Sequence, residues 1–240
     1  NWKAGGTAVS NTDGSITSQV SAAPDAGFSI VSYTGTGSAG ATVGHGLGVV
    51  PELLIIRRRD PAEAWPVWVG GGGFSNTQYL RLNGTNAVDT ATTLFNSTTP
   101  TSSVVTLGTG DFVNTNTKNY IMYAFASVES YCKIGSYVGN GSADGTFVYT
   151  GFRPSFILAK SLASGTSWFI KDSARSPNNV VNLRLYANAS NAEMTQATFH
   201  EVDFVSNGFK LRGNGSEDNA SGQTFIYLAI GDSFKYANAR

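Results

Sequence analysis

The sequence is poor in cysteine, and Cys132 is its only thiol among 240 residues. A single cysteine excludes an intrachain disulfide, and it cannot supply a zinc site that is built from several thiolates. Its neighbours Tyr131 and Ile134 indicate a small buried apolar residue and not a reactive thiol. We therefore expect a fold that is stable without disulfides, metal ions or cofactors.

Charge is also scarce. Charged residues make up 13% of the chain, about half of the usual ~25%, and 16 basic residues balance 16 acidic ones. The absence of a basic excess argues against a nucleic-acid partner and against binding to anionic membranes. No apolar run approaches the ~18–20 residues that a membrane-spanning helix needs, so we expect no membrane insertion. Ser, Thr, Asn and Gly supply the surface polarity, as is typical of extracellular and particle proteins.

The amino terminus, "NWKAGGTAVS", lacks both an initiator Met and the apolar core of a signal peptide. We expect the chain to be a processed product or a fragment of a longer protein.

An internal echo organises the chain. Ser32–Ala39 reads "SYTGTGSA", and Ser136–Ala143 reads "SYVGNGSA" at an offset of 104. Further matches keep the same order at offsets of 103 to 105: Pro51 with Pro154, Trp65 with Trp168, Leu80-Arg81-Leu82 with Leu183-Arg184-Leu185, and "YIMYAFA" with "FIYLAIG". The pattern predicts two homologous modules, 27–130 and 131–240, which follow an N-terminal arm or the end of an upstream domain, 1–26.

The local pattern is β throughout. Short alternating or apolar segments such as "FSIVSY", "ELLIIR", "VVTLG" and "GFKLRG" are separated by clusters of Gly, Ser, Asn and Thr, which form turns. No stretch shows a sustained helical period. Each module carries six to eight short strands, so we predict an all-β fold with two tandem antiparallel β-sandwich modules of jelly-roll-like type.

The glycine-rich echo also contains Gly35-x-Gly37-x-x-Gly40, the spacing of a dinucleotide-binding fingerprint. That fingerprint needs a helix after the loop, whereas "ATVGHGLGVVPELL" continues into another strand. The second copy, Gly139-x-Gly141-x-x-x-Gly145, breaks the motif. We therefore expect a structural loop in which Gly35, Gly37, Gly139 and Gly141 adopt positive φ.

Other candidate residues have a structural and a functional interpretation. His45 and His200 do not occupy equivalent places in the modules, while Glu201 and Asp203 share a strand face that is either solvated or able to bind a cation. Loop 213–222 resembles a calcium loop in composition only, and a long hairpin loop is favoured. Arg57-Arg58-Arg59 is either an exposed strand end or a phosphate or sulfate contact. Trp65 and Trp168 are either core residues or sugar-stacking platforms. We predict no catalytic, cofactor-binding or metal-binding residues.

Several segments together resemble a known module: "NWKAGG", "SNTDGSITSQVSA", "GFSIVSYTGTGSAGATVGHGLG", "SYVGNGSADGTFVYTGFRPSFILAK", "FVSNGFKLRG" and the terminal "FKYANAR". Nearly the whole chain is similar to a module at the C-terminal end of tail proteins of tailed bacteriophages, which recurs in marine phages and cyanophages. In that family the WKAGG segment follows upstream domains that are often lectin-like. The family carries no established catalytic residues, so none is transferred to this chain.

The resemblance implies a non-enzymatic virion protein of the tail fibre or tail tip type, concerned with host attachment. Its implied partners are other virion proteins, further copies of itself in a homotrimer, and a bacterial surface glycan. A purely architectural capsid or tail decoration protein is one alternative. A secreted glycan-active enzyme or a carbohydrate-binding module is the other, and the enzyme would need Glu201, Asp203 and a further acid to converge.

Overall fold

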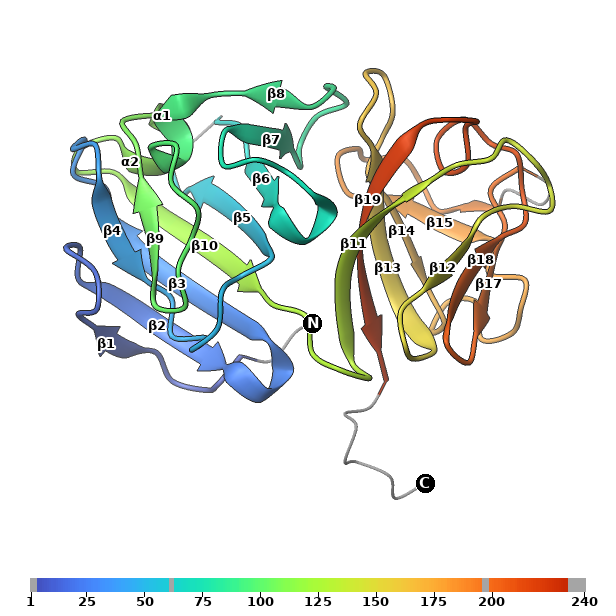
Figure 1. Ribbon diagram of the computed structural model, residues 1–240, viewed down its shortest axis with the longest axis horizontal. Coiled ribbons are helices and arrows are strands. Elements are labelled where there is room, and N and C mark those ends of the chain that lie inside the picture. The colour runs from blue at the N-terminus through green and yellow to red at the C-terminus, as the bar shows by residue number, and fades with distance from the viewer. Residues whose placement is uncertain (1–3, 61–62, 196–198, 233–240) are drawn as a thin grey trace. The chain divides into compact units, whose positions relative to one another are not determined.

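The computed structural model describes residues 4–60, 63–195 and 199–232 (Figure 1). The first three residues of the "NWKAGG" motif and the terminal "FKYANAR" motif lie outside these residues. Strands dominate the described chain, and its helices are single short turns, α1 (Thr92–Phe95) and α2 (Asp111–Asn114) with two 3-10 turns. The predicted all-β class is confirmed.

The chain divides into two compact units. Unit 1 comprises Asn1–Leu82 and Asp89–Ser127, and unit 2 comprises Asn83–Val88 and Val128–Arg240. The short segment Asn83–Val88 belongs to unit 2. Its Val88 amide donates to the Leu162 carbonyl, and the Gly165 amide donates to its Thr85 carbonyl. Nothing in the sequence indicates that this segment belongs to unit 2.

Unit 1 is built on an antiparallel sheet of eight strands in the order β1-β2-β3-β10-β5-β6-β7-β8 (Figure 1). A second sheet pairs β4 with β9. The bounds are β1 (Val9–Asn11), β2 (Ser18–Ala23), β3 (Phe28–Thr34), β4 (Ala41–Gly44), β5 (Leu53–Arg58), β6 (Pro66–Val69), β7 (Gln78–Arg81), β8 (Asp89–Thr90), β9 (Val104–Leu107) and β10 (Asn119–Phe125).

Unit 2 has a main sheet of six strands in the order β11-β19-β13-β14-β15-β16 and a second sheet in the order β12-β18-β17. The bounds are β11 (Cys132–Val138), β12 (Phe147–Tyr149), β13 (Pro154–Ser161), β14 (Phe169–Asp172), β15 (Leu183–Tyr186), β16 (Met194–Thr195), β17 (Val202–Val205), β18 (Gly208–Leu211) and β19 (Thr224–Gly231).

The main sheets share one strand order. The order β3-β10-β5-β6-β7-β8 in unit 1 corresponds, strand for strand along the chain, to β11-β19-β13-β14-β15-β16 in unit 2. Unit 1 adds β1 and β2 at the β3 edge, so described residues of the predicted arm belong to its sheet. The shared order is an observation, and a duplication as its origin stays a prediction.

Alternation along the central strands places one set of side chains between the sheets. Tyr33 of β3 stacks on Tyr120 of β10 at 5.2 Å between ring centroids, and both rings are buried. In unit 2, Tyr137 of β11 stacks on Phe225 of β19 at 5.0 Å. Such offset aromatic pairs add about 0.5–1.5 kcal/mol beyond their buried area. The cores of the two units are therefore centred on corresponding pairs of strands, β3 with β10 and β11 with β19.

Candidate functional sites

A buried asparagine holds the glycine-rich loop of unit 1. The Asn114 side-chain amide accepts a hydrogen bond from the Thr36 backbone amide at 2.8 Å, and it donates to the carbonyls of Ser38 and Gly108 at 2.9 and 2.8 Å. Its backbone carbonyl accepts from the Gly37 amide. Because Asn114 is fully buried, these bonds satisfy polar groups that water cannot reach.

Unit 2 repeats this arrangement around Asn219, which is also fully buried. Its side-chain oxygen accepts from the Asn140 amide at 3.0 Å, and its nitrogen lies 2.9 and 2.8 Å from the carbonyls of Ser142 and Gly213. The Asn219 backbone carbonyl accepts from the Gly141 amide. We call the Asn114 and Asn219 arrangements the asparagine clasps.

The glycines of the echo have two different roles. Gly37 and Gly141 have φ of +71° and +66°, as predicted. The same prediction is wrong for Gly35 and Gly139, which are absent from the positive-φ residues. They are required for close approach, because a Cβ at Gly35 would lie 2.4 Å from the Thr115 carbonyl oxygen.

The loop after β3 leads into β4 and not into a helix, so no row of helix N-terminal amides faces it. The clasps instead occupy its backbone groups with protein partners. The loop is therefore organised as a strand connection, which agrees with the structural interpretation of the glycine spacing.

The two histidines lie in different settings. His45 is fully buried in unit 1, where its Nε2 lies 3.2 Å from the Thr101 carbonyl and its Nδ1 accepts from the Leu47 amide. Burial lowers the pKa of His45 and favours the neutral ring. His200, in unit 2, places its Nδ1 3.0 Å from Oδ1 of the buried Asp218. His45 therefore has a structural role, and His200 belongs to a larger group of charged side chains.

The acidic pair does not form a cation site with a third ligand. Asp203 of β17 is paired with Arg212 at 2.7 Å, and the Glu201 carbonyl accepts from the Arg212 amide. Among residues 4–60, 63–195 and 199–232, no group of three or more His, Cys, Asp or Glu side chains could hold a metal ion. Asp203 thus lies on a partly solvated strand face beside an arginine, and Glu201 directly precedes that strand.

The two tryptophans differ in exposure. Trp168 is fully buried and therefore serves the core, as its structural interpretation predicts. Trp65 is half-buried, and the Arg57 guanidinium lies over its ring at 4.4 Å from the centroid. A sugar could not reach the Trp168 ring without displacing protein atoms, whereas Trp65 keeps part of its surface exposed beside Arg57.

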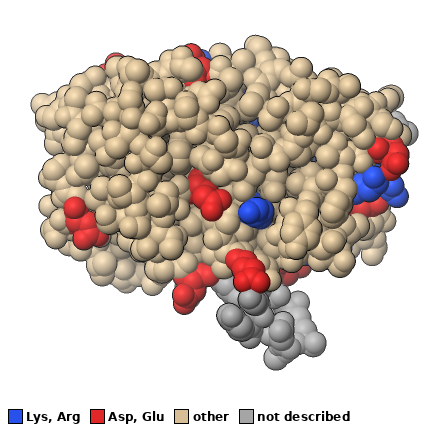
Figure 2. Space-filling model, viewed as in Figure 1, with Lys and Arg blue, Asp and Glu red and all other residues tan. Residues whose placement is uncertain are grey.

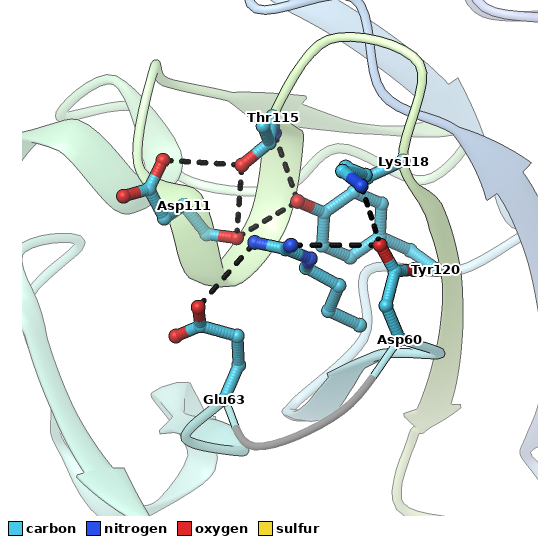
Figure 3. Close-up of polar contacts among 7 residues, drawn as sticks. Asp60, Glu63, Asp111, Thr115, Lys118 and Tyr120 are labelled. Atoms are coloured by element: carbon cyan, nitrogen blue, oxygen red, sulfur yellow. Dashed lines mark hydrogen bonds and ion pairs between the residues drawn. The ribbon is translucent and has the colours of Figure 1, made fainter.

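The three consecutive arginines, Arg57 to Arg59, lie in three different environments. Arg58 points inward and lies 3.5 Å from Asp60 and 3.4 Å from Glu63, while Lys118 pairs with Asp60 at 2.9 Å. Figure 3 shows Asp60 between Lys118 and the guanidinium, with Tyr120 behind them. The Lys118 ammonium holds the pKa of the Asp60 carboxyl below its usual range.

The Tyr120 hydroxyl anchors this corner to α2. It donates to the Asp111 carbonyl and accepts from the Thr115 amide, both at 2.8 Å (Figure 3). Arg58 and Lys118 therefore neutralise the two nearby carboxylates on a fixed support. Arg57 stacks on Trp65, and Arg59 has no ion pair within the described residues.

A group of buried charged side chains lies inside unit 2. Lys171 and Arg184 are fully buried, and Asp218 is 1% exposed. Lys171 Nζ donates to the Val181 carbonyl at 3.0 Å. The Arg184 guanidinium lies between the rings of Phe169 and Tyr186, at 5.0 and 4.7 Å from their centroids. We call Lys171, Arg184, His200, Glu217 and Asp218 the charged core cluster.

Contacts within the cluster are close but poorly aligned. Arg184 lies 2.8 Å from Glu217, which also accepts from the Tyr186 hydroxyl at 3.0 Å. Yet the Arg184 nitrogens and both Asp218 carboxylate oxygens make no aligned hydrogen bond to any described residue. Buried charges without full hydrogen bonding are costly, so the cluster lowers the free energy of unfolding of unit 2.

Unit 1 carries apolar or aromatic residues at the corresponding places. Leu54 of β5 corresponds to Ile157 of β13. Leu54 pairs with Trp68 and Ile157 pairs with Lys171, so Trp68 corresponds to Lys171. Val67 pairs with Leu80 as Ile170 pairs with Leu185, which aligns Tyr79 with Arg184. The match of Leu80-Arg81-Leu82 with Leu183-Arg184-Leu185 is therefore shifted by two residues from the structural correspondence.

The clasps align the other three positions. The Asn114 amide donates to Gly110 as the Asn219 amide donates to Gly215, so Val113 corresponds to Asp218 and Phe112 to Glu217. Gly110 and Gly215 in turn donate to Thr93 and Phe199, which aligns Leu94 with His200. Four of the unit 1 counterparts are at most 4% exposed, Trp68, Tyr79, Leu94 and Val113, and Phe112 is half-buried.

Comparison with known proteins gives a family assignment. A family model described as a domain of unknown function, DUF7483, matches residues 1–233. The chain belongs to the DUF7483 family. No curated protein and no solved structure matches it.

Sequence reasoning missed both clasp asparagines and the charged core cluster of this DUF7483 domain. A signal for the clasps was present, because Gly108–Asn114 and Gly213–Asn219 share the pattern G-x-G-x-x-x-N at an offset of 105. No helix of the described residues is long and apolar enough to cross a membrane.

Two buried lysines, Lys171 of the charged core cluster and Lys160 of β13, should give the DUF7483 domain a stability that rises with pH. Burial lowers the pKa of Lys171 from 10.5 to about 8, and it does the same for Lys160. Between about pH 8 and 10 the unfolded chain binds more protons than the folded chain, so the free energy of unfolding rises with pH. The full cost, about 3 kcal/mol for Lys171, is present below pH 8.

Denaturant unfolding at pH 7.5, 8.5 and 9.5 measures this slope. Lys171→Met should reduce it by about half, since Lys160 supplies the remainder. Above pH 10 the slope should reverse, because burial raises the pKa values of Tyr33 and Tyr137 and these tyrosines ionise first in the unfolded chain. An equal slope in the original chain and the variant would contradict this account.

Proposed function

We propose that this chain is a non-enzymatic structural protein of a bacteriophage virion, of the tail fibre or tail tip type, and that it contributes to attachment to a bacterial surface glycan. The resemblance of its sequence to phage tail modules supports the virion assignment. The charge-poor surface agrees with an extracellular particle protein, and Figure 2 shows charged side chains scattered among uncharged ones. Copy number and location in purified particles, measured by mass spectrometry and immunogold labelling, test this assignment.

One observation supports glycan contact: two aromatic rings are exposed on one face of β12. Phe147 is 45% and Tyr149 is 66% exposed, and their alternate positions place them about 7 Å apart along the strand. β12 forms an edge of its sheet, and its neighbour β18 places Gly208 opposite Tyr149. Gly208 has no side chain, and the Phe147 ring lies close to it, since a Cβ at Gly208 would be 3.1 Å from Phe147 Cε2.

Aromatic rings in this position suit a sugar. A ring presents a flat apolar face that matches the C–H face of a pyranose, and the tyrosine hydroxyl adds a polar handle. Lys210 lies opposite Phe147 and is paired with the exposed Asp144, which adds charged hydrogen-bonding groups beside the rings. Exposed apolar surface with a polar rim marks an interaction site.

Substitution of the rings tests the glycan contact. We expect Phe147→Ala and Tyr149→Ala each to weaken binding to host polysaccharide about five- to tenfold, and the double variant about thirtyfold or more, since each ring contributes about 1 kcal/mol. Binding is measured on a glycan array and by adsorption of multivalent chain to host cells. Phe199→Ala is the matched control, because Phe199 is 56% exposed and precedes β17 at the opposite edge of the sheet.

Two results would contradict the assignment. Multivalent chain that binds no host glycan would favour the purely architectural alternative. Binding that is equally strong in the double variant and in Phe199→Ala would exclude β12 as the contact.

A further inference from the structure

The outer face of the unit 1 main sheet carries an open trough of about 460 Å³. Gln19 and Ser21 of β2, Ser32 of β3 and Ile121 of β10 line its floor, and Arg59 lies at its β5 end. Gln19 pairs with Ser32, and Ser32 pairs with Ile121, so these side chains form one row across three strands. The trough lies wholly within unit 1.

Three hydrogen-bond donors in the trough are unused. The Arg59 guanidinium, the Gln19 amide and the Ser32 hydroxyl make no hydrogen bond or ion pair with any other residue that the structure describes, whereas Ser21 donates to the Gly6 carbonyl at 2.7 Å. The trough lining contains no acidic residue. A free guanidinium beside neutral donors is suited to an oxyanion, because the planar fork of arginine matches the geometry of carboxylate, sulfate and phosphate.

The neighbouring charges do not neutralise Arg59. Asp60 and Glu63 are the nearby carboxylates, and Arg58 and Lys118 occupy them at 2.9–3.5 Å (Figure 3). Arg57 and Arg59 therefore remain as positive charge without a carboxylate partner, and Arg57 is held over Trp65. The fixed pairing at this corner leaves Arg59 available to an incoming anion.

We propose that this trough binds an oxyanion group, carried as a carboxylate, sulfate or phosphate on a charged polymer, with Arg59 as its main contact and Ser32 and Gln19 as neutral donors. The inference does not rest on glycan stacking at β12, because Phe147 and Tyr149 belong to unit 2. Failure of either experiment leaves the other proposal standing.

Titration of the full isotope-labelled chain tests the site. Sodium sulfate, sodium phosphate and an oligo-glucuronate are added in separate NMR titrations at constant ionic strength, with a neutral glucose oligomer as the uncharged control. We expect saturable shifts at the Arg59 side chain and at the amides of Ser21, Ser32 and Ile121. Higher ionic strength should weaken the binding, because exposed charges are screened. The inorganic ions and the oligo-glucuronate distinguish a general oxyanion site from one that needs a sugar carboxylate, and saturation by any of the three supports the proposal.

Matched variants separate a site from general charge attraction. Arg59→Gln should weaken binding at least tenfold, and Arg59→Lys should weaken it less, because lysine keeps the charge but loses the fork. Arg57 does not line the trough and is held over Trp65, although it pairs with the trough residue Ile121, so Arg57→Gln should weaken binding much less than Arg59→Gln. Shifts that do not saturate, or equal losses in Arg57→Gln and Arg59→Gln, would overturn the proposal.

Discussion

Replacing Asp218 with valine should destabilise unit 2 by about 3–5 kcal/mol, because it removes a buried carboxylate that faces buried cations. Valine is the residue that unit 1 carries at the corresponding position, Val113, so its shape fits the fold. The loss would leave Lys171 and Arg184 buried with less compensating charge. The loss of packing at this position is small compared with that electrostatic cost.

The measurement must report on unit 2 alone, because a chain of two units need not unfold in one transition. Hydrogen exchange provides this, with amides of β19 reporting on unit 2 and amides of β10 reporting on unit 1. We expect Asp218→Val to lower protection in β19 and to leave β10 nearly unchanged. A loss below about 1 kcal/mol in β19 would contradict the cost assigned to the cluster.

A combined variant tests whether the cost comes from charge. Lys171→Met, Arg184→Met, His200→Leu and Glu217→Gln added to Asp218→Val remove every charge of the cluster, and Glu217→Gln is included because Arg184→Met would otherwise leave that carboxylate without its cation. Replacement of a whole buried ionic group is often neutral or stabilising by 1–4 kcal/mol. The combined variant should therefore be much more stable than Asp218→Val alone. Its failure to recover stability would show that Asp218 acts through packing and not through charge.

The contrast between the units explains what the sequence could and could not predict. Alternation and turn residues predicted the strands well, since β3, β5, β10 and β19 fall where alternating or apolar segments lie. The echo identified the loops but not their partners, because Asn114 ends the short turn α2, Asn219 lies in a loop, and both positions lie outside the echo. Burial of Lys171 and Arg184 had no sequence signal, because lysine and arginine are rarely buried.

The shifted match at Leu80 and Leu183 shows a related limit. Identical letters, Leu-Arg-Leu, occur in both units, yet the strand register aligns Tyr79 with Arg184. A shift of two residues keeps each side chain on the same face of a strand, so alternation alone cannot detect it. The conflict is settled only by the pairing of β6 with β7 and of β14 with β15.

Replacing Asn114 with alanine should destabilise unit 1 by about 3 kcal/mol. The substitution removes three side-chain hydrogen bonds, each worth about 1 kcal/mol, and it leaves the buried Gly108 carbonyl without that partner. Asn114→Asp should cost at least as much at neutral pH, because a carboxylate would face the carbonyls of Ser38 and Gly108 in place of a donor. Exchange protection in β10, with denaturant unfolding, measures both losses.

Asn116→Ala is the matched control, since Asn116 lies two residues after Asn114 and has an exposed side chain, and its cost should stay within 0.5 kcal/mol. Asn219→Ala should reproduce the loss in β19, because the clasp of unit 2 uses the same contacts. Gly35→Ala should be at least as damaging as Asn114→Ala, since its Cβ meets backbone and not a mobile side chain. If Asn114→Ala were no more destabilising than Asn116→Ala, the clasp would not be what fixes the glycine-rich loop, and close packing at Gly35 alone would have to hold it.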